Sequence, residues 1–151
     1  LGTLDEATAA LGIARSICMA PGMGELLVTI QRDLYDLMAE VSATPENAAH
    51  FRKVNEERVS WLSAQTDALS EQVNLPKGFI LPGDSQGGAA LALARTIIRR
   101  AERRVVQMLH TQQLENVQLV RYLNRLSSLC FVLELWENQS SGKTTPTLAR
   151  R

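Results

Sequence analysis

The strongest chemical signal in the sequence is a run of arginines spaced about one helical turn apart. Arg95, Arg99 and Arg103 recur every fourth residue, and Glu102 falls on the same side of a helix. Stacked cations repel one another, so this pattern favours an anionic partner. Because a guanidinium binds phosphate through two parallel charge-assisted hydrogen bonds, a polyphosphate is the expected ligand.

A second polar stripe lies in the next helical segment. Arg121, Asn124, Arg125 and Ser128 gather on one side of it, whereas leucines and valines occupy the other. A hairpin between the two segments would bring the stripes side by side and form a cleft suited to phosphate. The plainer interpretation is a solvated basic face paired with carboxylates of a neighbouring helix or subunit, and the spacing leaves both open.

Residues 74–88 form a long connection with two prolines and four glycines, which excludes a helix there. Its apolar centre, Phe79-Ile80-Leu81, argues against disorder because such side chains favour burial. Two interpretations are equally good: a lid over the end of the core, or a wall for a flat apolar ligand.

The elements that must position these residues are helices. Apolar residues recur at steps of three and four, which predicts helices over residues 4–19, 25–43, 45–73, 89–110 and 115–139. Thr44 is expected to cap the third helix, with Pro45 in its first position. Because no strand pattern occurs, the predicted fold is all-α: a five-helix up-and-down bundle as one domain over residues 1–139, with a flexible tail over residues 140–151.

The composition of the 151 residues excludes several classes of protein. Hydrophobic residues make up 45%, and 16 basic residues balance 16 acidic ones, which suits one globular core and argues against a polyanion-coating protein. Basic and aromatic residues do not interleave as in single-strand nucleic-acid binders, so no nucleic-acid partner is expected. No apolar run approaches the roughly 20 residues that cross a bilayer, so no membrane partner is expected either.

The cysteines and histidines do not predict a metal site within the protein. Cys18 and Cys130 have neither the spacing of a zinc site nor that of a disulfide framework, so they are expected to be buried free thiols. Neither His50 nor His110 follows a glutamate at the spacing of a di-iron bundle site. We therefore expect no cluster of side chains that binds a metal by itself.

Several segments together resemble the PduO-type ATP:cob(I)alamin adenosyltransferases. They are Phe-Ile-Leu-Pro-Gly at residues 79–83, the arginine segment at 90–103 and Tyr-Leu-Asn-Arg-Leu-Ser at 122–127, in the family's order and with matching intervals. Residues 2–6 are similar to a further family segment. The resemblance implies a homotrimer of five-helix bundles that binds ATP between adjacent subunits.

The resemblance also implies roles for individual residues. The residues that it places at ATP and its Mg²⁺, or in the network that holds them, are Arg95, Arg99, Glu102, Arg103 and Asn124. Asp5 would pair with Arg95 across the subunit interface. Phe79 would stand against the lower face of the corrin, where it keeps away the lower ligand of cobalt. Arg95, Arg99 and Phe79 would form the catalytic set.

The implied reaction transfers the 5′-deoxyadenosyl group of ATP to cob(I)alamin and releases triphosphate. Negative charge builds on the leaving triphosphate, so arginines and Mg²⁺ suffice and no general base is needed. Cobalt accepts an electron more readily once its lower ligand is lost, which a bulky apolar side chain promotes. A reductase and an adenosylcobalamin-dependent enzyme are the expected partners, in the cytoplasm.

The chain departs from the family pattern at several positions. Asp84 replaces a usual second glycine, Ser128 stands where aspartate is common, and the remaining differences are Ala7 and Thr8 for Leu-Asn and Glu134 and Leu135 for Ala-Arg. The family's glycine-rich segment that wraps the triphosphate does not occur in the sequence, and residues 1–5 resemble a protein's interior. We therefore expect a targeting peptide or another N-terminal segment before them.

These departures keep two alternatives open beside the enzyme. The first is a non-catalytic member of the same fold that binds a nucleotide or corrinoid as a carrier or sensor. The second is a structural bundle whose arginines pair with carboxylates or touch nucleic acid. A test for turnover separates the enzyme from the carrier, and the placement of the arginines separates both from the structural bundle.

Overall fold

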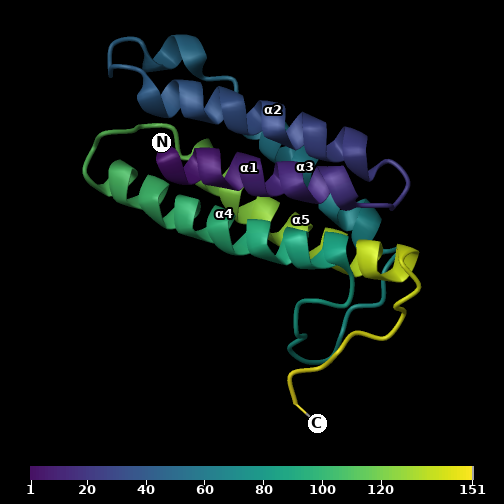
Figure 1. The fold of residues 1–151 in the computed structure, drawn as a ribbon. Coiled ribbons are helices and arrows are strands. Elements are labelled where there is room, and N and C mark those ends of the chain that lie inside the picture. Colours follow the sequence, from purple (N-terminus) through teal and green to yellow (C-terminus); the bar gives the residue numbers. More distant parts are fainter. Residues whose placement is uncertain (151) are drawn as a thin grey trace.

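Five α-helices and one short 3-10 helix build the fold over residues 1–150, which the computed structural model describes (Figure 1). In chain order they are α1 (Gly2–Ile17), α2 (Met23–Ser42), η1 (Ala48–Phe51), α3 (Glu56–Ser70), α4 (Gln86–His110) and α5 (Gln118–Ser140). Within these residues the only β pairing is a single bridge between Ile80 and Leu148. The predicted all-α five-helix bundle is confirmed.

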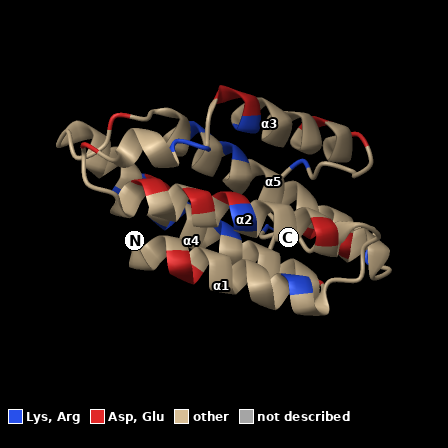
Figure 2. Ribbon diagram, turned by 90° about the horizontal axis from the view of Figure 1, so that it is seen from above, with Lys and Arg blue, Asp and Glu red and all other residues tan. Residues whose placement is uncertain are grey.

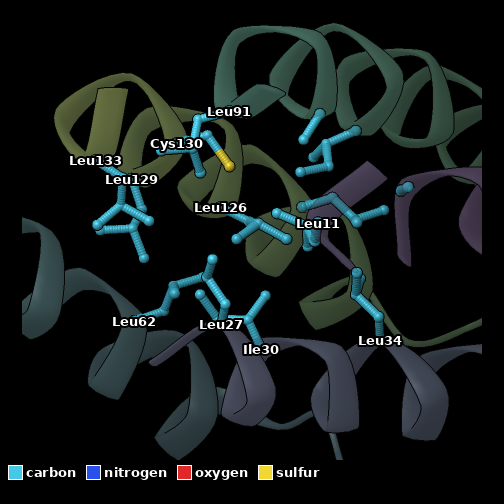
Figure 3. Close-up of a cluster of buried hydrophobic side chains, with 14 of the residues drawn as sticks. Leu11, Leu27, Ile30, Leu34, Leu62, Leu91, Leu126, Leu129, Cys130 and Leu133 are labelled. Atoms are coloured by element: carbon cyan, nitrogen blue, oxygen red, sulfur yellow. The ribbon is translucent and has the colours of Figure 1, made fainter. Parts of the chain in front are cut away.

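The long helices α4 and α5 pack against each other at the centre of this arrangement. α1 lies along α4 and α2 lies along α1, while α3 packs on α5 (Figure 1). All five helices supply leucines to one core, and one fully buried leucine from each helix is, in chain order, Leu11, Leu27, Leu62, Leu91 and Leu126 (Figure 3). Each such side chain contributes about 1.5–3 kcal/mol by leaving water, so this core fixes the positions of α4 and α5.

The third helix begins later than the sequence predicts. Instead of capping a helix at Pro45, the Thr44 carbonyl accepts hydrogen bonds from the backbone N–H groups of residues 47 and 48, which closes a turn before η1. α3 begins after Asn55, whose side chain accepts a hydrogen bond from the N–H of Arg58 at 3.0 Å. Buried Val54, whose carbonyl accepts from Asn116, holds the chain in an extended path up to that cap.

The start of α4 is fixed against the end of α5. Ser85 caps α4 by accepting from the N–H of Gly88 at 3.0 Å, and its hydroxyl donates to Asn138 of α5 at 2.7 Å. A Cβ on Gly87 would lie 2.8 Å from the Cγ of Glu137, so only glycine allows this approach. The two helices that carry the polar stripes are thus locked together at one end.

The loop before α4 and the C-terminal segment lie side by side beyond the end of the bundle (Figure 1). The N–H of Ala149 donates to the carbonyl of Phe79, and that of Leu81 donates to the carbonyl of Thr147, both at 2.8 Å. Thr147 also donates to the carboxylate of Asp84 through its N–H and its hydroxyl. The flexible tail stays a prediction, but in the structure these residues have defined partners on the loop.

Neither cysteine forms a disulfide, as predicted for free thiols. Cys130 is buried, whereas Cys18 is only half-buried. Desolvation by burial raises the pKa of both thiols to about 12, so neither is a reactive thiolate near neutral pH. Among residues 1–150, no helix combines the length and the apolar character that a membrane span requires.

Candidate active site

The arginine stripe of α4 faces a groove between α4 and α5, where it meets Asn124 and Ser128 of the second predicted stripe. Arg121 and Arg125 of that stripe instead line a separate cavity with residues of α3. Asn124 of α5 donates a hydrogen bond from Nδ2 to Oε1 of Glu102 on α4, at 3.0 Å. A cavity of about 280 Å³ lies at this point, and Arg99 and Arg103 line it together with these two residues. Four of the residues expected at ATP are therefore neighbours in one chain.

A larger cavity of about 710 Å³ lies further along the same groove, toward the loop before α4. Arg99 lines both cavities, and Arg95 lines the larger one. The apolar side of the larger cavity is built by Pro76, Phe79, Ile80, Pro82, Phe131 and Val132. One arginine thus joins a small polar cavity to a larger one with an apolar wall.

Phe79 projects from the loop rather than covering the core. It is 89% exposed although it is a large apolar residue, and it lies at the rim of the larger cavity. Of the two sequence interpretations of this loop, the wall of a ligand cavity fits this placement better than a lid. An exposed aromatic beside an apolar-walled cavity is typical of a site whose ligand covers the ring.

The groove arginines have no carboxylate partner in the described part of the chain, residues 1–150. Among residues 1–150, no Asp or Glu oxygen lies within 4.0 Å of the guanidinium groups of Arg95, Arg99 or Arg103. Arg100, which points to the other side of α4, does pair with Glu6 of α1. Of the five arginines of α4, only Arg100 is therefore paired within residues 1–150. The three groove arginines remain open, which disfavours the structural-bundle alternative.

The cavity also contains a buried carboxylate that the sequence analysis did not place at the site. Glu134 of α5 is only 2% exposed, lines the larger cavity, and has an Oε1 atom with no hydrogen-bond partner in the described part of the chain. Desolvation by burial raises its pKa to about 7; the positive charge of Arg95 opposes this rise, and the negative charge of Asp84 adds to it. Near neutral pH this group exchanges its proton readily.

Comparison with known proteins decides the family. Residues 1–137 match the family model described as cobalamin adenosyltransferase. The chain belongs to this family. The resemblance drawn from the arginine, Phe-Ile-Leu-Pro-Gly and Tyr-Leu-Asn-Arg segments is thereby confirmed.

Curated relatives in the cobalamin adenosyltransferase family agree with this assignment. The chain is 39% identical to the corrinoid adenosyltransferase of Bacillus subtilis over 145 residues, which cover 93% of this chain and 74% of that protein. It is 36% identical to the corrinoid adenosyltransferase PduO of Citrobacter freundii over 141 residues, which cover 93% of this chain but only 42% of the longer protein. The chain therefore matches about three quarters of one relative and less than half of the other.

Solved structures of the family share the fold. A variant of the PduO-type ATP:corrinoid adenosyltransferase from Lactobacillus reuteri, complexed with cobalamin and ATP, has a TM-score of 0.89 and 30% sequence identity. That match covers 99% of this chain and 83% of the other. A second variant of the same protein, complexed with ATP, has a TM-score of 0.88 at 30% identity.

Asp5 is the predicted site residue that a single chain does not bring to the others. It lies exposed in the first turn of α1, and among the described residues it forms no ion pair with Arg95. Its neighbour Glu6 forms the only ion pair between α1 and an arginine of α4 in residues 1–150. Pairing of Asp5 with Arg95 of another subunit stays a prediction.

The carboxylates at the site do not form a metal cluster. In residues 1–150 no group of three or more His, Cys, Asp or Glu side chains is placed to hold a metal ion. Glu102 is the acid that lines the small cavity, and Ser128, where aspartate is common in the family, contributes only a hydroxyl that donates to the Asn124 carbonyl at 3.5 Å. These donors fit Mg²⁺ that arrives with phosphate oxygens rather than a preformed cage.

Glu134 had a sequence signal, although periodicity alone could not interpret it. The residue stands between Leu133 and Leu135 in the apolar part of α5, where a charge is unexpected. Such a position predicts either a partner or a functional role. Only the packing of α4 and the loop around α5 shows that this acid faces a cavity.

Proposed function

We propose that this chain transfers the 5′-deoxyadenosyl group of ATP to the cobalt of cob(I)alamin and releases triphosphate. The observation that carries the proposal is the open guanidinium face of α4, with Arg95, Arg99 and Arg103, beside a cavity with an apolar wall. Its relatives are named corrinoid adenosyltransferases, and the similar L. reuteri protein was solved with cobalamin and ATP. Because Arg99 lines both cavities, a nucleotide and a corrinoid bound in them would meet there.

The small cavity suits the triphosphate. Arg99 and Arg103 offer guanidinium groups to phosphate oxygens, and the hydrogen bond between Asn124 and Glu102 fixes the opposite edge. When bound with ATP, Mg²⁺ supplies further positive charge against the phosphates, with Glu102 as the nearest available carboxylate. The chain thus holds the phosphates by charge and needs no rigid metal cage.

The chemistry is a displacement at carbon. Co(I) attacks the ribose 5′ carbon, a cobalt–carbon bond forms, and the carbon–oxygen bond to the triphosphate breaks with its electron pair leaving on oxygen. Because negative charge grows on the leaving group, guanidinium groups already in place stabilise the transition state more than the bound substrate. No proton has to be removed, so the site needs no general base.

The larger cavity suits the corrinoid. Phe79 and Phe131 provide apolar surface for a flat ring, and Phe79 is exposed enough to be covered by it. An apolar side chain against the lower face of the ring keeps water and the tethered base away from cobalt. The absence of a lower ligand favours the four-coordinate cobalt that accepts an electron more readily. Packing of the ring against the cavity wall would also hold cobalt near the ribose carbon.

The proposal includes a homotrimer in which Asp5 of one subunit pairs with Arg95 of the next. It is supported by the exposure of Asp5, by the open Arg95 and by two exposed apolar residues on adjacent helices, Ile13 of α1 and Leu93 of α4. A reductase that supplies the electron, an adenosylcobalamin-dependent enzyme that uses the product and a cytoplasmic location belong to the same proposal. The reductase follows from the chemistry, because cobalt must be reduced to Co(I) before it attacks the ribose carbon.

The direct test supplies the protein with ATP, Mg²⁺ and chemically reduced cobalamin. We expect formation of adenosylcobalamin, followed by its absorbance change, together with one triphosphate per turnover. The matched control is Arg104→Ala, which removes an exposed arginine of α4 that does not line either cavity of the groove. This variant should keep its turnover.

Binding of ATP and cobalamin without turnover would contradict the catalytic proposal and favour a carrier or sensor of the same fold. Ser128 is the residue that bears on that outcome, because it removes a carboxylate that the family commonly has. If Ser128→Asp restored turnover to an otherwise inactive chain, the missing carboxylate at position 128 would explain the lack of activity. If it did not, the carrier function would stand.

A further inference from the structure

The further inference concerns Glu134, the one buried acid whose role in the fold is not evident. Four carboxylates are buried in residues 1–150: Asp33, Glu40, Glu134 and Glu137. Asp33 and Glu40 accept from side chains of other segments, and Glu137 accepts from two backbone N–H groups. Only Glu134 keeps a buried oxygen, Oε1, without a partner in this part of the chain.

An unpartnered buried carboxylate is unfavourable for folding. Transfer of such a group out of water is costly unless hydrogen bonds or a cation compensate for it. Arg95 lies close enough to lower the pKa of Glu134, yet its guanidinium is more than 4.0 Å from the carboxylate in residues 1–150. The compensation is therefore incomplete in the free chain, and a ligand could complete it.

The position of Glu134 indicates which ligand would do so. Ser127, Phe131 and Glu134 follow one another at steps of four and three residues on α5, and all three line the larger cavity. The cationic groups of this cavity are Arg95 and Arg99 on α4 and Lys77 on the loop. A carboxylate on the apolar side repels phosphate, so its partner is a neutral donor.

The corrinoid of the proposed function carries such donors. A corrin ring bears acetamide and propionamide side chains around its edge. Each primary amide has two N–H groups, and either can donate a hydrogen bond to a carboxylate oxygen. Precursors with free carboxylates at the same places would instead bring a second negative charge beside Glu134. In a partly desolvated cavity that repulsion is strong.

Resting on the proposed function, we propose that Glu134 accepts a hydrogen bond from a primary amide at the edge of the bound corrinoid. Glu134 thereby makes the site selective for corrinoids with amidated side chains over those with free carboxylates. The hydrogen bond favours binding because it gives Oε1 the partner that it lacks in the free chain. Corrinoids with free carboxylates are rejected because their charge repels that of Glu134. A site built to bond an N–H group discriminates strongly against a ligand that cannot supply one.

The test compares two corrinoids at equilibrium, without turnover. Cobinamide carries amides, and cobyrinic acid carries free carboxylates on the same ring. Both are reduced to the Co(II) form, and their binding is followed by absorbance at pH 8. We expect the wild type to bind cobinamide at least tenfold more tightly, and Glu134→Gln to shrink that ratio at least fivefold through tighter binding of cobyrinic acid. The affinity for ATP should not change.

Two further variants control for folding and for loss of a charge. Glu134→Ala introduces the residue that is common in the family, so it should fold and should also shrink the ratio, here by weaker binding of cobinamide. Glu25→Gln removes an exposed carboxylate of α2 outside the cavity and should leave the ratio unchanged. Helical content and Tm confirm that each variant is folded.

An unchanged ratio in both Glu134 variants would overturn the inference, as would an effect on ATP affinity in place of corrinoid affinity. Failure of the wild type to bind either corrinoid would overturn it together with the proposed function. If the ratio changes as expected while the wild type forms no adenosylcobalamin, the inference stands and the catalytic proposal falls. If turnover is normal but the ratio is unchanged, the catalytic proposal stands and the inference about Glu134 falls.

Discussion

The two sides of α5 differ in whether their polar side chains have partners within the protein. On the side that faces α2 and α3, the hydroxyl of Tyr122 donates to Asp33 at 2.6 Å, and Arg58 donates to the same carboxylate oxygen at 2.6 Å. On the side that faces the groove, the guanidinium groups of α4 have no carboxylate partner in residues 1–150, and Glu134 keeps a bare oxygen. The buried carboxylates that serve the fold are paired inside it, whereas Glu134 and the groove arginines are left for ligands.

The paired side is built as a set of cross-links between distant segments. Arg58 stacks on Trp61, with its guanidinium carbon 4.2 Å from the ring centroid, while it binds Asp33. Glu40 near the end of α2 accepts from Asn116 at 3.0 Å and from Arg52 at 3.3 Å. These contacts join α2 to the segments before α3 and α5, so they hold the frame on which the groove is mounted.

The charge of the helices shows the same division. α2 carries Glu25, Asp33, Asp36 and Glu40 with a single arginine, and acidic bands follow one another along it (Figure 2). α4 carries five arginines and one glutamate. The formal net charge of the protein is zero, but its charges are unevenly distributed. The excess positive charge lies on α4, where an anion is expected to bind.

The largest effect should come from breaking the paired side. Asp33→Ala removes the acceptor shared by Tyr122 and Arg58 and leaves a buried hydroxyl and a half-buried cation without it, so we expect a loss of about 3–5 kcal/mol in the free energy of unfolding. Urea denaturation followed by circular dichroism measures it. The matched control is Asp36→Ala, which breaks only an exposed ion pair with Lys53 and should cost less than about 1 kcal/mol. Equal losses in the two variants would remove the distinction.

The unpaired carboxylate of the groove should make stability depend on pH. Burial raises the pKa of Glu134 to about 7 against 4.5 for the exposed group, so the unfolded chain loses this proton first as pH rises. Below about pH 4.5 the carboxyl is neutral in both states, and between pH 4.5 and 7 the folded state loses up to about 3 kcal/mol of stability from this group.

Glu134→Gln should remove that contribution and raise the stability at pH 8 relative to the wild type. The other charged groups around the cavity are Lys77 and Asp84 on the loop and Arg95 and Arg99 on α4. They stay unchanged in the variant. Denaturation at pH 5 and at pH 8 checks the difference. A variant that is equally destabilised at both values would show that Glu134 serves the fold.

The open arginines should affect binding and not folding. Arg99→Ala removes one guanidinium from both cavities, and we expect a loss of about 1.5–3 kcal/mol in ATP binding, or at least tenfold in Kd. Calorimetry measures it, and Tm should stay within about 2 °C because the side chain has no carboxylate partner in residues 1–150. An unchanged Kd would contradict a phosphate role for this residue.

The groove also predicts a contact between subunits. Asp5→Asn keeps the size of the side chain and removes its charge, so it should weaken ATP binding or trimer formation by about 1 kcal/mol, a several-fold change. Sedimentation at several protein concentrations, with and without ATP, measures the assembly. A wild type that stays monomeric throughout would remove the basis of this prediction.

The smallest effect should come from the contact between the C-terminal segment and the loop. Thr147→Val removes the hydroxyl that donates to Asp84 at 2.6 Å and keeps the backbone pairing, so we expect a local loss of about 1 kcal/mol. Proteolysis of the tail should become several-fold faster while global unfolding is unchanged. The same cleavage rate in wild type and variant would contradict a role of this contact in holding the loop.

Several parts of this molecule were predictable because they depend on neighbours along the chain. The steps of three and four between apolar residues predicted five helices, and the steps of four between Arg95, Arg99 and Arg103 predicted one basic face. The start of α3 was not predicted, because two caps compete there: Thr44 with Pro45 has a good local pattern, yet Asn55 caps the helix. Burial of Val54 decides between them, and burial is not local.

The sequence by itself determined the bundle and the cationic face of α4, because helix periodicity is a property of residues within a few turns of one another. Only the tertiary structure decided which charges are paired. Asp33 and Tyr122 meet across 89 positions of the chain, and Glu134 faces a cavity because α4 and the loop pack around it. Partners, desolvation and cavities arise where distant segments meet, so the difference between a structural acid and an acid left for a ligand exists only in the folded chain.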